Sequence, residues 1–178
     1  MRHAQRTIGS ALVLLLGLAV GLAEAQPQFS GTWVLDRAQS QLPQHPHHGR
    51  DASDRSGPPP DVRLIVEQQG NTLKATRSIA RGARERSMSE TFVIDGSERS
   101  EPARRGGTAV TRATLGGDRL VISKTYTAPA REQGQPPRTF SRESVWTLSP
   151  DGRTLTIDTT MQSDRGQRTM KHVFTKAT

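Results

Sequence analysis

Three short stretches of the chain repeat one pattern, in which a glycine is followed three positions later by a leucine. They are Gly70-Asn71-Thr72-Leu73, Gly117-Asp118-Arg119-Leu120 and Gly152-Arg153-Thr154-Leu155. Glycine tolerates the positive φ of a tight hairpin turn, and each leucine opens an alternation of apolar and polar residues with the period of a half-buried strand. The pattern predicts an antiparallel β meander that turns back on itself repeatedly.

Alternation of this kind marks nine candidate strands. They are Phe29–Asp36, Val62–Gln68, Thr72–Ile79, Ser87–Asp95, Thr108–Leu115, Arg119–Thr127, Thr139–Ser149, Arg153–Met161 and Gln167–Lys176. Most separators are short and turn-like, such as Asp95-Gly96-Ser97, whereas Arg81–Arg86 and Ala128–Pro137 are longer. Sequential hairpins in this number favour closure, which removes exposed sheet edges. We therefore predict an all-β fold, an antiparallel up-and-down meander that closes into a barrel of 8–10 strands, with the first and last strands as neighbours.

The N-terminal segment has the features of an export signal. Arg2 and Arg6 precede an apolar run over Ile8–Leu22, and Ala23-Glu24-Ala25 offers small residues where a signal peptidase cleaves. The run is shorter than the about 20 residues that a membrane-spanning helix needs, which argues against an uncleaved anchor. We predict a signal peptide over 1–25, one domain over 26–178 without a transmembrane segment, and a secreted or periplasmic protein.

Residues 37–61 interrupt the strand pattern. The segment is rich in proline and histidine and has almost no apolar residue after Leu42, so it is predicted to be a flexible loop with at most one helical turn at Arg37–Gln41. The segment contains side chains that commonly bind metals, namely three histidines and two aspartates: His45, His47, His48, Asp51 and Asp54. Closely spaced histidines in a flexible loop are more often incidental, so no metal site is predicted.

The opening Phe29-Ser30-Gly31-Thr32-Trp33 resembles the Gly-x-Trp signature of the first barrel strand in lipocalins and fatty-acid-binding proteins. The mature chain also resembles secreted bacterial lipocalin-like proteins of unknown function, through Phe29–Asp36, the Gly70–Leu73 turn, Trp146–Leu155 and the closing Val173–Lys176. The resemblance implies a lipocalin-like barrel with a small apolar cavity.

The same resemblance implies a structural role for Trp33 as a plug at one end of the barrel. Gly31 leaves space for close approach of neighbouring strands, and a late arginine covers the indole ring in lipocalins. Arg168 in the final strand is the candidate for that cation–π contact, with Lys171 as its substitute. The alternative is that Trp33 is simply a core aromatic.

The apolar face of each strand is taken as inward. This gives Trp33, Leu35, Leu64, Val66, Leu73, Ala75, Met88, Phe92, Ile94, Leu120, Ile122, Trp146, Leu148, Leu155, Ile157, Met161, Met170 and Phe174. The same parity also carries six polar residues, predicted to meet a ligand: Arg77, Glu90, Lys124, Tyr126, Arg142 and His172. Three basic groups against one acidic group favour the carboxylate or phosphate of an amphiphile. Three alternatives stay open: cations that extend into solvent, simple pairing with Glu90, and a parity change at a β-bulge.

No catalytic constellation accompanies the strands. There is no Gly-x-Ser-x-Gly elbow, and no spacing places two carboxylates across a cleft, so neither an enzyme nor a cofactor is predicted. The net charge of +8 suits an anionic envelope surface, but seven aromatic residues in all are too few for a nucleic-acid stacking surface. We predict a barrel that binds a small hydrophobic, anionic molecule. The alternative is a filled barrel that adheres to anionic envelope surfaces, with Arg81, Arg84, Arg86, Arg104 and Arg105 on one face.

Overall fold

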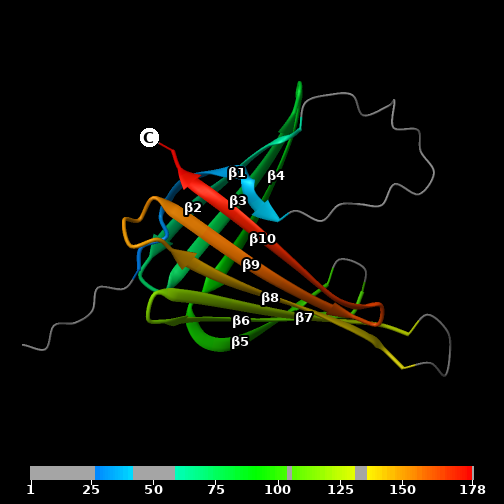
Figure 1. Cartoon of the computed structure of the whole chain (residues 1–178). Coiled ribbons are helices and arrows are strands. Elements are labelled where there is room, and N and C mark those ends of the chain that lie inside the picture. Colours follow the sequence, from blue (N-terminus) through cyan, green and yellow to red (C-terminus); the bar gives the residue numbers. More distant parts are fainter. Residues whose placement is uncertain (1–26, 42–58, 104–105, 131–135, 178) are drawn as a thin grey trace, which may run out of the picture.

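A computed structural model of the protein describes residues 27–41, 59–103, 106–130 and 136–177 (Figure 1). Ten strands form one antiparallel sheet over these residues. They are β1 (Gly31–Gln41), β2 (Asp61–Gln69), β3 (Thr72–Arg81), β4 (Arg84–Val93), β5 (Asp95–Pro102), β6 (Thr108–Gly116), β7 (Arg119–Ala128), β8 (Arg138–Leu148), β9 (Thr154–Ser163) and β10 (Gly166–Lys176).

The sheet curls into a nearly closed barrel (Figure 1). Its strand order is β4-β3-β2-β1-β10-β9-β8-β7-β6-β5. Every pair of adjacent strands is therefore consecutive in the sequence, except the pair β1 and β10. In that pair Trp33 lies opposite Lys176 and Leu35 opposite Phe174. The predicted meander and the predicted contact between first and last strands are confirmed. The two edges of the sheet are β4 and β5, and the line where they face one another is called the seam below.

The turns show where glycine is required. Gly70 and Gly117 begin two-residue turns with φ of 54° and 58°, as the repeated pattern predicts. The turn between β3 and β4 is equally short, because Arg81 pairs with Arg84 across Gly82-Ala83. The longer separator predicted at 81–86 is therefore wrong, since Gly82, with φ of 56°, lets the hairpin close at once.

Two further predictions about elements are wrong. Strand β5 has no apolar alternation in Asp95-Gly96-Ser97-Glu98-Arg99-Ser100-Glu101-Pro102, so its pairing with β6 gave no signal in the sequence. Strand β1 continues to Gln41 in place of a helical turn, after a register shift beyond Asp36, whose carboxylate accepts the backbone N–H groups of Ala38 and Gln39. The predicted signal peptide, the remainder of the predicted 37–61 loop up to residue 58 and the histidine cluster lie outside the described residues.

The two ends of the barrel differ. The end with the β2–β3, β4–β5, β6–β7 and β8–β9 turns, called the closed end, contains the large side chains that are fully buried: Phe29, Trp33, Leu73, Leu120 and Leu155. The opposite end, called the mouth, carries the β3–β4 and β9–β10 turns. Inward positions near the mouth include Arg77 and the exposed Ile79, Met88 and Phe140 as well as the buried Val62 and Ala109, so most of the apolar core lies toward the closed end.

Trp33 is fully buried at that end, and the cation beside its ring is not the predicted residue. The indole Nε1–H donates to the Phe29 carbonyl at 3.0 Å, and Lys176 Nζ lies 5.3 Å from the ring centroid. Arg168 lies opposite Met161 near the β9–β10 turn, at the other end of β10, so the prediction for Arg168 is wrong. A Cβ on Gly31 would lie 2.9 Å from Lys176 Cε, so this glycine leaves the space that the covering lysine occupies.

Candidate functional site

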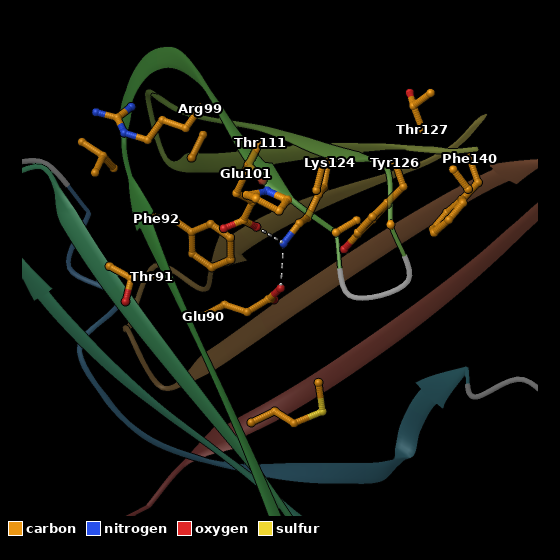
Figure 2. Close-up of a pocket in the computed structure, with 18 of the residues that line it drawn as sticks. Glu90, Thr91, Phe92, Arg99, Glu101, Thr111, Lys124, Tyr126, Thr127 and Phe140 are labelled. Carbon is orange, nitrogen blue, oxygen red and sulfur yellow. Dashed lines mark hydrogen bonds and ion pairs between the residues drawn. The ribbon is translucent and has the colours of Figure 1, made fainter. Parts of the chain in front are cut away.

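A cavity of about 1170 Å³ lies inside the barrel along the seam. Its wall combines apolar groups such as Phe92, Ala113 and Phe140 with the charged groups Glu90 and Lys124 (Figure 2). Small-molecule pockets usually measure about 300–1,000 Å³, so this interior is large enough for a ligand. Side chains therefore do not fill the barrel completely along the seam, which counts against the filled interior of the alternative interpretation. Small inward residues on β6, Ala109 and Ala113, leave part of this space.

Four strands bring charged side chains together beside the cavity. Glu90 on β4 accepts hydrogen bonds from Lys124 on β7 and from Arg142 on β8, each at 3.3 Å. Lys124 also forms an ion pair with Glu101 on β5 at 3.2 Å. Register explains the convergence, because Lys124 and Arg142 lie directly opposite one another on the inner face of β7 and β8. Glu90, Lys124, Arg142 and Glu101 are called the charge cluster below.

Lys124 links the two sides of the seam. Its side chain is only 11% exposed, and it contacts a carboxylate from each edge strand, Glu90 on β4 and Glu101 on β5 (Figure 2). Burial opposes its charge, but the hydrogen bond that Lys124 donates to Glu101 and the negative charge of Glu90 more than offset burial, so the pKa of Lys124 lies above its usual value. The ammonium group therefore stays charged and holds the edges together from inside the barrel.

Arg77 supplies a further cation that the charge cluster leaves uncompensated. Its Nε is buried and has no hydrogen-bond partner among the described residues. Burial, and then the charge of Arg142, lower the pKa of Arg77. Because guanidinium groups stay protonated in proteins, the consequence is a positive charge held in a position that disfavours it. An anion that reached this place would remove that cost.

His172 and Tyr126 complete the predicted set. His172 is buried and stacks on Phe174 with centroids 6.2 Å apart; burial and then the charge of Arg77 lower its pKa below 6.5. Tyr126 stacks on Phe140 at 4.4 Å, and its ring lies 5.4 Å from Lys124 Nζ. The imidazole is therefore held neutral, and the phenol lies beside the one lysine of the cavity wall.

The structure thus joins Glu90, Lys124 and Arg142 by ion pairs and sets Arg77 and His172 close by. Pairing with Glu90, which the sequence left open as an alternative, does occur. Neither Arg77 nor Arg142 is part of the cavity wall, and Arg142 is reached from the cavity through Glu90. That these residues bind a ligand stays a prediction.

Glu101 is the residue that sequence reasoning missed, because β5 was not recognised as a strand. The sequence does place Glu101 on the same face of an extended segment as Ser97 and Arg99, and all three residues lie in the cavity wall. That alternation was the signal from which β5 could have been recognised. Two absences hold for the described ranges: no helix is long and apolar enough to cross a membrane, and no three metal-ligating side chains converge.

Solved structures show the class of barrel that this architecture defines. The ileal bile acid-binding protein of zebrafish, complexed with cholic acid, superimposes with a TM-score of 0.51 at 15% identity, over 84% of this chain and 98% of that chain. A brain fatty-acid-binding protein of Drosophila melanogaster gives 0.44 at 19% identity, over 84% and 100%. Fatty-acid-binding protein 1 of Echinococcus granulosus gives 0.45 at 12%, over 84% and 98%.

The likeness to the zebrafish protein is one of fold: the chain forms a ten-stranded barrel of the fatty-acid-binding-protein type. No protein-family model and no curated protein matches the sequence.

Proposed function

We propose that the barrel binds a small amphiphile with an anionic head group and releases it unchanged. The observation that carries the proposal is the cavity of about 1170 Å³ whose wall combines apolar side chains with the buried ammonium group of Lys124. Such a wall suits a molecule with an apolar body and one charged end, since each part meets groups of its own kind.

The balance of charge favours a negative head group. Five cations lie in the cavity wall or behind it, namely Arg77, Arg99, Lys124, Arg138 and Arg142. Three carboxylates oppose them: Glu90, Glu101 and Asp95, the last paired with Arg99 at 3.2 Å. A carboxylate ligand near Lys124 competes with Glu90 and Glu101, and it also lowers the cost of the uncompensated charge at Arg77.

The apolar body has a place as well. Phe92 and Ala113 form the part of the wall toward the closed end, and the stacked pair Tyr126 and Phe140 forms a part nearer the mouth. The zebrafish protein of the same architecture is complexed with cholic acid, so a barrel of this kind can hold an acid with an apolar body. The predicted export signal would put this binding in a secreted or periplasmic protein.

The test is displacement of a fluorescent fatty acid from the wild type and from Lys124→Met, the variant that removes the cation of the cavity wall, at two salt concentrations. A charge-assisted contact contributes about 1.5–3 kcal/mol, so the variant should bind roughly 10- to 150-fold more weakly. Arg63→Met is the matched control, because Arg63 is exposed on strand β2 beside the buried Val62 and Leu64. Equal affinity in all three proteins, or no binding by the wild type, would contradict the proposal.

A further inference from the structure

The charged residues are distributed differently at the two ends of the barrel. Toward the closed end, three cations have acidic partners, namely Lys74 with Glu67 at 3.0 Å, Arg99 with Asp95 at 3.2 Å and Arg119 with Asp118 at 3.8 Å, whereas Lys176 and Arg153 form no ion pair among the described residues. Exposed pairs of this kind contribute little to stability, but each carboxylate offsets the charge of its own cation.

At the mouth, the cations are not neutralised in this way. Six exposed arginines lie in its turns or at the strand ends beside them: Arg81, Arg84, Arg86, Arg138, Arg165 and Arg168. None of the six forms an ion pair within the part of the chain that the structure describes. The acidic residues that the structure describes at the same end are fewer, namely Asp61, Glu85, Glu101 and Asp164, and Glu101 is already paired with Lys124.

Apolar side chains are exposed on the same half of the molecule. Ile79 on β3, Met88 on β4 and Phe140 on β8 are 38%, 67% and 41% exposed. They follow the inward parity of their strands toward the mouth, so they lie among the arginines and beside the opening of the cavity. The mouth therefore presents positive charge around an apolar centre.

We propose that the mouth docks on the surface of an anionic phospholipid bilayer, with the barrel opening toward the lipid. Negatively charged head groups match the arginines, and the boundary of the acyl chains accepts Ile79, Met88 and Phe140. A soluble polyanion matches the charge but offers nothing to the exposed apolar residues. The surface shares Met88, Arg138 and Phe140 with the cavity wall, whereas Arg81, Arg84, Arg86, Arg165 and Arg168 lie outside that wall, so docking is tested with arginines that do not line the cavity.

The first test measures which end of the barrel faces the bilayer. Because the sequence contains no cysteine, one introduced cysteine can be labelled at a chosen position. An environment-sensitive fluorophore is attached to Ala83→Cys in the β3–β4 turn at the mouth, or to Asn71→Cys in the β2–β3 turn at the closed end. Vesicles of phosphatidylglycerol and phosphatidylcholine should shift the emission of the first probe to the blue and leave the second unchanged. Equal shifts, or a shift of the Asn71→Cys probe alone, would overturn the proposal.

Affinity is the second test, measured by vesicle co-sedimentation with the full chain so that the apolar 8–22 segment is common to every variant. Each arginine near an anionic surface is worth about a fivefold change, so Arg84→Gln, Arg86→Gln and Arg168→Gln combined should weaken binding by roughly 100-fold. The control changes the same net charge at the closed end, with Lys74→Gln, Arg119→Gln and Arg153→Gln combined, and should weaken binding only slightly. Equal losses in the two triple variants would show that net charge alone is responsible.

A third arm distinguishes the partner. Heparin and a DNA oligonucleotide are titrated into the Ala83→Cys conjugate at the salt concentration used for the vesicles. The proposal expects binding without the blue shift that lipid produces, because neither polyanion buries the apolar residues of the mouth. A blue shift of the same size with either polyanion would favour a soluble acidic partner and overturn the assignment to lipid.

Discussion

The closed end and the mouth are made from the same strands, yet they differ in how far their side chains are buried and paired. At the closed end Trp33 and Phe29 are fully buried, and the indole N–H has its acceptor. Toward the mouth the lumen holds the charge cluster, the guanidinium of Arg77, whose buried Nε has no partner among the described residues, and apolar side chains in contact with solvent. Buried groups that have their hydrogen-bond and packing partners stabilise the folded state, whereas a polar or apolar group without such a partner can gain free energy by contacting a ligand or another surface. We therefore expect substitutions at the closed end to affect stability most, and substitutions toward the mouth to affect the proposed binding most.

The largest expected difference between the two ends is the contribution of a large aromatic residue to the free energy of unfolding. Trp33→Ala should lower the free energy of unfolding by about 3–5 kcal/mol, because it leaves a large cavity and an unpaired Phe29 carbonyl. Phe140→Ala should cost about 1 kcal/mol, since that ring is already 41% exposed. Urea denaturation of both variants measures this. Similar losses would mean that the mouth contributes to the core as much as the closed end does.

Glu90→Gln should change stability and ligand affinity in opposite directions. The variant should lose about 1 kcal/mol of stability, a reduced figure because the Glu90 side chain is 38% exposed. Affinity for a fatty acid should rise, since Lys124 and Arg142 lose a competing carboxylate. Chemical denaturation and a ligand titration test the two parts. A variant that binds fatty acid more weakly would contradict the view that Glu90 occupies the place of a ligand head group.

The seam gives a smaller and more local effect. In Glu101→Gln, the edge strand β5 loses its contact with Lys124, and its amide hydrogens should exchange about two- to threefold faster. Glu98→Gln is the matched control on the same strand, because Glu98 lies opposite Arg112 and does not contact Lys124. Hydrogen-exchange mass spectrometry covers both. Unchanged exchange in Glu101→Gln would show that Lys124 does not hold the seam.

The smallest effect is on pH dependence. Burial and Arg77 lower the pKa of His172 below 6.5, so the unfolded chain takes up a proton before the folded barrel does. Stability should therefore be complete above pH 6.5 and fall as the pH drops below that value, because more protons are then bound in the unfolded state. His172→Gln should reduce this slope in melting temperature against pH. An identical slope in both proteins would mean that His172 is not the group responsible.

Strand alternation predicted nearly all of the sheet, because each recognised strand buries one apolar face. It failed at β5, where Ser97, Arg99 and Glu101 face a cavity and no core selects apolar residues. The inner face of the site was predictable for the same reason: Lys124 and Glu90 share parity with buried neighbours such as Ile122 and Phe92. Which cation approaches which ring was not predictable. Lys176 rather than Arg168 covers Trp33 because strand register, which depends on turn lengths, decides it.

The contrast between the two ends rests on the claim that the lumen near Lys124 selects negative charge. One calorimetric titration of the wild type compares a fatty acid with the fatty alcohol of equal chain length, so the protein is unchanged and only the head group differs. The account predicts that the carboxylate binds roughly 10- to 150-fold more tightly, the equivalent of about 1.5–3 kcal/mol, and that the advantage shrinks as salt is raised. Equal affinities, or tighter binding of the alcohol, would contradict it.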